Sequence, residues 1–261
     1  MCARIKEPFQ CEGSKDFHDR LTDWIGDVLY DILPEHGYEI RDEQIYTAYQ
    51  IADAFCEQTV HLAEAGLGTG KTLAYLLTAI PYARFKRKPV VIACATTALQ
   101  EQLAAETSDI YAFSKLLDLD VDVRMAKDDR QYICDAKVEE NTSELKLVSP
   151  ELNEWIGNTK RGERSEIPMV SDVIWKKVNW DESRDCSMCS NRGYCKLVKA
   201  REYYRGATDL LIVNHATFFK DLWTRKERIA NGEQPILPSY SAVIFDEGHK
   251  IMLPAAMQAG D

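Results

Sequence analysis

A glycine-rich stretch that ends in a lysine and a threonine stands in the first third of the 261-residue chain. Three glycines within five positions allow backbone N–H groups to turn inward and approach an oxyanion closely. The Lys71 ammonium can reach the β- and γ-phosphates of a nucleotide, and the Thr72 hydroxyl can bind Mg²⁺. We therefore predict a phosphate-binding loop for ATP, with Ala65 where the strict pattern has glycine. The loop is Glu64-Ala65-Gly66-Leu67-Gly68-Thr69-Gly70-Lys71-Thr72.

Two acidic residues follow a short apolar run near the other end of the chain. Residues 242–245 read Ala-Val-Ile-Phe, and Asp246 and Glu247 come directly after them. At the end of a strand, Asp246 would hold Mg²⁺ through water, and Glu247 would orient and deprotonate the attacking water. Such a pair is a weak signal alone. Together with the loop it predicts an ATP-hydrolysing site, because both lie where a parallel sheet binds ligands.

Four of the eight cysteines form a second pattern. Cys186, Cys189 and Cys195 are spaced as Cys-x2-Cys-x5-Cys, and Cys134 stands well before them. Four thiolates can close a tetrahedral Zn²⁺ site or hold an iron–sulfur cluster. The spacing alone leaves zinc, a cluster and unligated thiols open. The other cysteines lack such spacing and are interpreted as buried or incidental thiols; they are Cys2, Cys11, Cys56 and Cys94.

The segment around these cysteines is basic and rich in aromatic residues. Residues 158–205 hold eleven basic and seven acidic side chains, a balance of +4, whereas the net charge of −10 leaves −14 for the rest. Aromatic rings beside Lys and Arg suit base stacking and phosphate contact on single-stranded nucleic acid. A solvated charged face over core aromatics is the alternative. The aromatic residues are Tyr132, Trp155, Trp175, Trp180, Tyr194, Tyr203 and Tyr204.

The elements that must hold these residues are strands and helices in alternation. Residues 59–63 are predicted as a strand before the loop, and residues 72–85 as the helix whose N-terminus faces the phosphates. Further strands are predicted at 89–95, 209–215 and 242–245, because each is an apolar run bounded by polar residues. This alternation is typical of an α/β fold with a parallel sheet.

Two helices are predicted before the loop. From residue 17 to residue 33 apolar side chains recur at spacings of three and four, and Pro34 ends the pattern. A second helix is predicted at 45–55, directly after Gln44. Gln44 precedes the loop lysine by 27 positions and is a candidate neighbour of the adenine base. An ordinary surface position is the alternative for this glutamine.

The strand pattern stops between residues 126 and 199, where helical fragments replace it. One fragment begins at Ser149-Pro150, a cap followed by proline at the first helical position. We therefore expect a domain inserted into the sheet domain. The predicted organisation is an ATP-binding domain in two parts, at 1–125 and 201–261, with the inserted domain at 126–200.

Composition narrows the class of protein. The first ten residues contain no apolar segment of a secretory signal, and no apolar run reaches membrane-spanning length. We therefore expect a cytoplasmic protein without a membrane partner. In that compartment the cysteines are expected to be thiols or metal ligands rather than disulfides.

Two of these motifs resemble motifs of a known family, the iron–sulfur superfamily 2 DNA helicases of the DinG/XPD-like group. The chain resembles the N-terminal half of such helicases. The stretch 64–72 resembles motif I, in which alanine is usual at the Ala65 position. Asp246-Glu247-Gly248-His249 resembles motif II, a DEAH box with glycine in place of alanine. The resemblance implies that His249 lies at the nucleotide and couples its state to DNA.

Further segments match the same family. Arg41-x-x-Gln44 is similar to its adenine-recognising motif. Residues 95–103, where a helix is predicted to open at Thr96, are similar to motif Ia, which lies beside the DNA backbone. Only Thr96 and Gln100 carry over there, because Cys94 stands where a threonine is common. Residues 213–215 also match the segment common before motif II.

The resemblance implies a RecA-like P-loop ATPase domain with an inserted, mostly helical iron–sulfur domain. The family places one cysteine before a Cys-x2-Cys-x5-Cys group, so it favours a [4Fe–4S] cluster over zinc on Cys134, Cys186, Cys189 and Cys195. The implied activity is ATP- and Mg²⁺-dependent DNA unwinding, usually 5′ to 3′, in repair or replication. The implied substrates are single-stranded and forked duplex DNA, and protein partners are not specified.

Members of this family continue beyond motif II into a second RecA-like domain that supplies an arginine finger. The present sequence ends at Asp261, so we expect it to be the N-terminal part, with weak or absent ATP hydrolysis and no unwinding by itself. One alternative is a non-catalytic nucleotide- and metal-binding module, stapled by zinc. Another keeps the cluster as a redox switch that controls DNA affinity.

Overall fold

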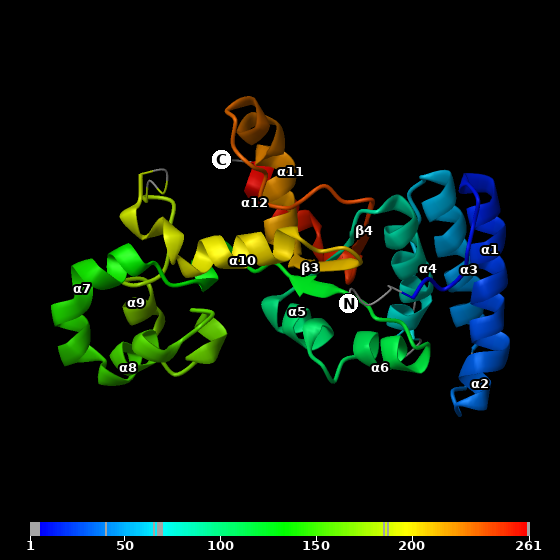
Figure 1. The fold of residues 1–261 in the computed structure, drawn as a ribbon, viewed down its shortest axis with the longest axis horizontal. Coiled ribbons are helices and arrows are strands. Elements are labelled where there is room, and N and C mark those ends of the chain that lie inside the picture. Colours follow the sequence, from blue (N-terminus) through cyan, green and yellow to red (C-terminus); the bar gives the residue numbers. More distant parts are fainter. Residues whose placement is uncertain are drawn as a thin grey trace. The chain divides into compact units, whose positions relative to one another are not determined.

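The structure is a computed structural model that describes residues 6–39, 41–64, 66, 70–184, 186 and 188–259, without the side chains of residues 144 and 146–148 (Figure 1). The chain forms two compact units. The first consists of Met1–Met125, Ala207–Phe219 and Pro238–Asp261, and the second of Ala126–Gly206 and Lys220–Leu237.

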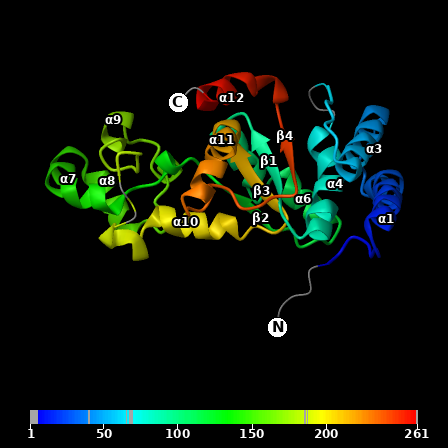
Figure 2. The ribbon, with the colours of Figure 1, turned by 90° about the horizontal axis from the view of Figure 1, so that it is seen from above.

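Four parallel strands form the sheet of the first unit, in the order β2-β3-β1-β4 (Figure 2). The central strand β1 is buried along its whole length, as its continuous apolar run requires when both faces are covered. Its Val90 lies opposite Leu210 of β3 and opposite Ala242 of β4. The predicted α/β class with a parallel sheet is confirmed. The strands are β1 (Val90–Cys94), β2 (Val123–Met125), β3 (Leu210–Asn214) and β4 (Ala242–Phe245).

The predicted helices at 17–33, 45–55 and 72–85 are all present. The first is α1 with its continuation η1, a π-helical segment, and the third begins at Lys71 itself. Helix α11 (His215–Ala230) starts in the first unit and continues into the second. The others in the first unit are α1 (Ser14–Gly26), η1 (Asp27–Ile32), α2 (Leu33–Glu35), α3 (Asp42–Glu57), α4 (Lys71–Lys86), α5 (Thr97–Ala104), α6 (Asp109–Leu116), η5 (Gly248–Lys250) and α12 (Met252–Ala259).

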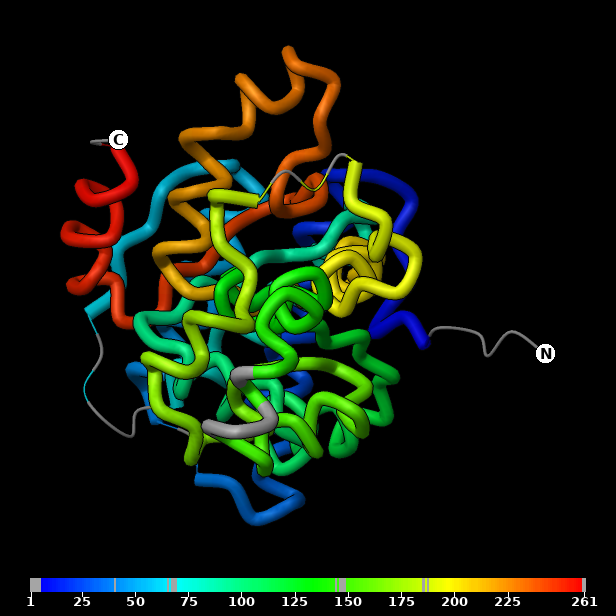
Figure 3. Tube along the Cα trace, turned by 90° about the vertical axis from the view of Figure 1, so that its left-hand side faces the viewer, coloured from blue at the N-terminus to red at the C-terminus, as the bar shows by residue number. Residues whose placement is uncertain are grey.

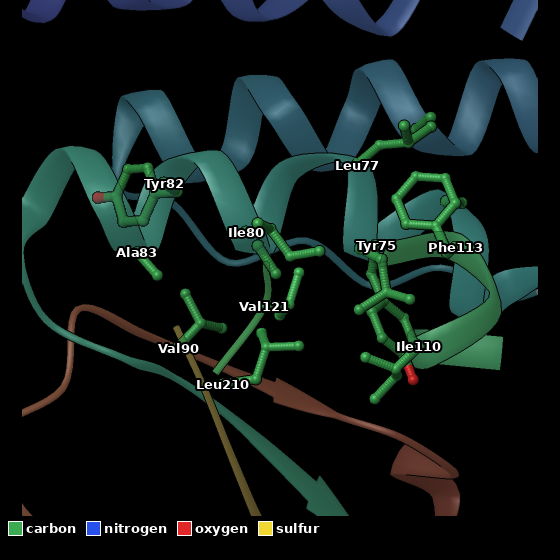
Figure 4. Close-up of a cluster of buried hydrophobic side chains, with 14 of the residues drawn as sticks. Tyr75, Leu77, Ile80, Tyr82, Ala83, Val90, Ile110, Phe113, Val121 and Leu210 are labelled. Atoms are coloured by element: carbon green, nitrogen blue, oxygen red, sulfur yellow. The ribbon is translucent and has the colours of Figure 1, made fainter. Parts of the chain in front are cut away.

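Helix α4 lies in the middle of the hydrophobic core. Its residues from Ala74 to Ala83 are buried, and Leu77 and Ile80 have no exposed surface. Figure 4 shows Ile80 and Ala83 pointing toward Val90 of β1, whereas Leu77 points to the other side of the helix. Each such leucine or isoleucine contributes about 1.5–3 kcal/mol through burial. The helix that carries the phosphate-binding residues is therefore held firmly against the sheet.

The expected strand at 59–63 is wrong. Residues 59–64 form no strand in the described sheet, and the side chains of Val60 and Leu62 are 90% and 91% exposed. The pattern that suggested a strand contained only two large apolar residues, Val60 and Leu62, and a strand also requires a neighbour with which to pair. Conversely, β2 was missed because its sequence, Val-Arg-Met, contains no apolar run.

The second unit is mostly helical, and its part Ala126–Gly206 can be followed from green to yellow in Figure 3. In its described residues, the β-pairing is limited to two isolated bridges, Tyr132 with Glu163 and Ile133 with Asn179. Its core includes Ile133, Leu152 and Val178. The elements are η2 (Asp129–Gln131), α7 (Asp135–Val148), α8 (Pro150–Asn158), η3 (Arg164–Glu166), α9 (Asp172–Trp175), η4 (Ser190–Gly193) and α10 (Lys196–Arg205).

Within the described ranges, no helix combines the length and the apolar character needed to cross a membrane.

A buried ion pair ties α4 to the sheet at the end remote from Lys71. The Arg84 guanidinium donates to both carboxylate oxygens of Asp209, at 3.1 and 3.0 Å, and both side chains are only 3% exposed. Arg84 also donates to the carbonyl of Asp120 at 2.7 Å, and Asp209 accepts the backbone N–H of Asp122 at 3.0 Å. One side chain thus fixes the C-terminal end of α4 to β3 and to the segment before β2.

Replacing Arg84 by alanine is expected to lower the free energy of unfolding of the first unit by about 3–5 kcal/mol, because Asp209 becomes an unpaired buried charge. Urea denaturation followed by circular dichroism measures the loss. Arg20→Ala is the control, since Arg20 pairs with Asp16 at 3.4 Å with side chains 57% and 37% exposed; that change should cost less than about 1 kcal/mol. Equal losses for the two variants would contradict this account.

Candidate functional site

The described end of the glycine-rich loop is held by Gln44. Gly70 stands before α4 with a left-handed backbone (φ 73°), and its carbonyl accepts a hydrogen bond from Gln44 Nε2 at 3.3 Å. The Gln44 side chain is 8% exposed, and a Cβ added at Gly70 would lie 2.3 Å from Nε2. Gln44 is therefore not an ordinary surface residue. The predicted loop residues Ala65, Leu67, Gly68 and Thr69 lie outside the described residues, whereas Gly66 lies within them.

A cavity of about 470 Å³ opens beside this contact. It is lined by the predicted adenine residues Arg41 and Gln44 and by the predicted phosphate-binding residues Gly70, Lys71 and Thr72. Its volume falls within the range of small-molecule sites, which is about 300–1,000 Å³. The rest of the lining was not predicted, and nothing in the sequence placed the four residues of α6 here. The other lining residues are Leu33, Tyr38, Glu39, Leu73, Leu76, Asp109, Ala112, Phe113 and Leu116.

The acidic pair after β4 lies close to the start of α4. Lys71 Nζ is 3.7 Å from Glu247 Oε1, and His249 Nδ1 is 3.6 Å from Glu247 Oε2. The backbone N–H of Glu247 donates to Asp246 Oδ1 at 3.1 Å. Glu247 itself has a left-handed backbone (φ 57°), which is strained for a residue with a side chain. The structure thus brings together the lysine, the glutamate and the histidine that the sequence singled out.

A buried histidine supports this turn from behind. His215 Nε2 lies 3.0 Å from the carbonyl oxygens of both Ala93 and Asp246, and the side chain has no exposed surface. Because both neighbours are acceptors, Nε2 carries the proton. Burial lowers the pKa of His215, which keeps the ring neutral. The sequence marked residues 213–215 only as a family segment and gave no signal of this contact.

The charge of Asp246 also affects the pKa of two further buried groups. Burial, with a smaller contribution from the Asp246 carboxylate, raises the pKa of Cys94 to about 12. The same two causes raise the pKa of the Tyr75 hydroxyl. Cys94 is therefore a protonated core thiol, in agreement with its interpretation as a buried cysteine.

The two residues expected to contact DNA differ in exposure. Thr96 is exposed and caps α5, because its hydroxyl accepts the backbone N–H of Leu99 at 3.2 Å. The side chain of Gln100 is fully buried and donates to the carbonyl of Ile212 at 3.4 Å. This burial disagrees with a direct DNA contact by Gln100, whose amide instead holds α5 against β3.

The four patterned cysteines all belong to the second unit. Cys134 and Cys195 immediately precede α7 and α10, and the Trp180 indole N–H donates to Cys186 Sγ at 3.2 Å. Burial raises the pKa of Cys195, while backbone N–H groups at the start of α10 partly oppose the shift. No three His, Cys, Asp or Glu side chains are placed to hold a metal ion within the described part of the chain.

Comparison with known proteins finds that this chain is similar to helicases. A sequence profile of the DEAD/DEAH box helicases matches residues 43–160. The probable ATP-dependent helicase YpvA of Bacillus subtilis is 41% identical over 261 residues, which cover 95% of this chain and 41% of that protein. The ATP-dependent DNA helicase DinG of Photobacterium profundum is 29% identical over 250 residues, covering 87% of this chain and 34% of that protein.

A third relative, the 3′-5′ exonuclease DinG of Bacillus subtilis, is 28% identical over 241 residues, covering 89% of this chain and 24% of that protein. The parallel sheet and these matches define a RecA-like α/β domain of the DEAD/DEAH box helicase type. Within that class, the chain is similar in sequence to the DinG-like helicases of superfamily 2. It spans less than half the length of each of these relatives.

Gly70→Ala is expected to destabilise the first unit by about 1–3 kcal/mol, because the added Cβ enters the space of the Gln44 amide and the left-handed backbone disfavours alanine. In a Gln44→Ala background the same change should cost less, although not zero, since only the steric part is relieved. Thermal unfolding of the four proteins measures both costs.

The matched control is Gly157→Ala in α8, where an added Cβ meets nothing within 4 Å. It should be neutral or stabilising, because alanine favours a helix over glycine. An identical cost of Gly70→Ala in both backgrounds would show that Gln44 does not pack against the loop.

Proposed function

We propose that this chain is the ATP-binding part of a cytoplasmic DNA helicase that couples ATP hydrolysis to movement along single-stranded DNA. The observation that carries the proposal is that Gln44 and Lys71 line one cavity and that Glu247 lies 3.7 Å from Lys71. A phosphate-binding lysine, an acidic pair after a parallel strand and a glutamine beside the cavity are the parts that a P-loop motor requires. The family supports the same interpretation.

The proposed roles combine the sequence motifs with the positions of the described groups. The sequence pattern of the loop assigns residues 65–70 to the phosphates; Lys71 neutralises them, and Thr72 with Asp246 holds Mg²⁺. Glu247 orients and deprotonates the attacking water. Arg41 and Gln44 contact the adenine end, because both line the cavity next to Gly70. His249, near Glu247, would sense the nucleotide and transmit its state to DNA.

DNA is the proposed substrate, as single strands and forked duplexes, in repair or replication with 5′ to 3′ movement. Two of the matched relatives carry names that fit this proposal, an ATP-dependent helicase and an ATP-dependent DNA helicase. The exposed Thr96 at the start of α5 is the proposed backbone contact. Exposed Tyr194 and Tyr203, 49% and 60% exposed, are available in the second unit for base stacking.

A [4Fe–4S] cluster on Cys134, Cys186, Cys189 and Cys195 is proposed for the second unit. The donor chemistry fits such a group: all four residues are free thiols, and Cys186 accepts an indole N–H. Sulfur atoms that accept N–H groups are typical of cluster sites. When bound, the cluster would brace the segments 134–135 and 186–196 against each other. A zinc ion on the same thiols, in a non-catalytic nucleotide-binding module, is the second candidate.

Lys71→Ala is expected to weaken binding of a fluorescent ATP analogue with Mg²⁺ at least about tenfold, because a charge-assisted phosphate contact is lost. Glu247→Gln should instead tighten binding a few-fold. The reason is that the partly exposed Lys71–Glu247 pair, worth about 0–1 kcal/mol, competes with the phosphate for the lysine. Fluorescence titration of each variant gives both affinities.

Lys88→Ala, which removes an exposed lysine beyond the other end of α4, should leave the affinity unchanged. Unaltered nucleotide binding by Lys71→Ala would overturn the assignment of the site.

Protein purified without oxygen is expected to contain about four iron and four sulfide per chain and to be brown. Cys189→Ser should lose most of both, whereas Cys56→Ser, which changes a cysteine of the first unit, should retain them. Metal and sulfide analysis together with a visible spectrum distinguishes a cluster from zinc. One zinc per chain without sulfide would exclude the cluster and favour the zinc-stapled module.

A further inference from the structure

His215 connects three parts of the first unit through one ring nitrogen. It is the first residue of α11 and directly follows β3. Its Nε2–H is shared by two carbonyl oxygens, that of Ala93 in β1 and that of Asp246 after β4, each at 3.0 Å. The ring of Phe245 packs edge-on against it, with centroids 5.8 Å apart. A histidine directly after β3 therefore contacts the backbone of the proposed Mg²⁺ ligand.

This contact completes the anchoring of Asp246. Its backbone N–H donates to the Ala93 carbonyl at 2.9 Å, and its own carbonyl accepts from His215. Its carboxylate accepts the N–H of Glu247 at 3.1 Å. Both backbone groups of the proposed metal ligand are thus fixed, and one carboxylate oxygen is oriented by the turn that follows.

That turn needs an external support. Glu247 adopts a left-handed backbone (φ 57°, ψ 46°), which costs free energy in a residue other than glycine. Such a conformation persists only where the surrounding structure holds it. The hydrogen bond from His215 acts on the carbonyl of the peptide that joins Asp246 to Glu247, so it acts on the strained turn itself.

We propose that His215 is a positioning residue of the nucleotide site, which holds the turn of Asp246 and Glu247 where both side chains serve Mg²⁺ and the attacking water. This inference rests on the proposed function. In this role the ring acts through the backbone of Asp246, whose carbonyl accepts its N–H. The alternative is that His215 is a core residue that contributes packing alone.

The Mg²⁺ dependence of nucleotide binding separates the two interpretations. In the full chain, the affinity for a fluorescent ATP analogue is measured with Mg²⁺ and with a chelator. His215→Ala is expected to reduce the gain in affinity given by Mg²⁺ about tenfold, because an unsatisfied carbonyl lets the turn relax. Binding without Mg²⁺ should stay near that of the unmodified chain. His215→Gln, which can again present an N–H to both carbonyls, should restore most of the gain.

Asn214→Ala is the matched control. It removes the cap of α11, in which Asn214 Oδ1 accepts the N–H of Thr217 at 2.7 Å, without altering a contact to Asp246. It should lower thermal stability about as much as His215→Ala does, and it should leave the Mg²⁺ dependence of nucleotide binding unchanged. Equal Mg²⁺ dependence of His215→Ala and the unmodified chain would overturn the positioning role. Absence of Mg²⁺-dependent binding in the unmodified chain would instead overturn the proposed function.

Nitrogen-15 NMR of the histidine rings in the unmodified chain tests the same role even where His215→Ala fails to fold. It is expected to show His215 as the neutral tautomer with the proton on Nε2 at neutral pH. Addition of Mg²⁺ and ATP should shift its resonances. A ring protonated on Nδ1 alone, or one indifferent to Mg²⁺ and ATP, would contradict the proposal.

Discussion

The hydrogen bond from the backbone N–H of Asp246 to the carbonyl of Ala93 determines where the chemistry of this domain can take place. It extends the parallel pairing of β1 and β4 by one residue past the end of β4. The acidic pair thereby emerges at the carboxyl edge of the sheet, at the level where α4 begins with Lys71. The 3.7 Å separation of Lys71 and Glu247 follows from that register.

The rest of the first unit keeps that register in place. Helix α4 is buried along most of its length, so it cannot slide without disturbing the core. Its far end is fixed by the buried pair of Arg84 and Asp209, and Asp209 directly precedes β3. Strand β3 in turn leads into His215, which reaches back to the acidic turn. Both ends of the sheet are thus tied to the site by side chains with hardly any exposure.

Local patterns predicted the elements that carry chemistry but not the contacts between them. The apolar runs of β1, β3 and β4 and the helix after the loop follow from residue type alone. Residues 59–63 show the limit, because a strand forms only where a neighbour accepts it, and Val60 and Leu62 are exposed instead. The three-residue strand β2 owes its place to pairing with β3 rather than to its own sequence.

The candidate site shows the same division. Lys71 and Glu247 were predictable from residue type and spacing, whereas the place of His249 near the nucleotide was expected only from the family resemblance. The burial of Gln100 was not predictable, because a glutamine in a polar helical segment is expected to be exposed. Only the structure shows that β3 packs against this side of the helix and accepts its hydrogen bond. His215 was likewise recognisable only from three-dimensional proximity, since 31 positions separate it from Asp246.

Hydrogen–deuterium exchange of the unmodified chain, with and without Mg²⁺ and ATP, tests the central claim most directly. We expect Mg²⁺ with ATP to slow exchange in three separate segments: 41–45, the start of α4 from residue 70, and the turn at 246–249. These segments converge only if the loop, the glutamine and the acidic pair form one site. Unchanged exchange at the start of α4 and at the acidic turn would contradict it.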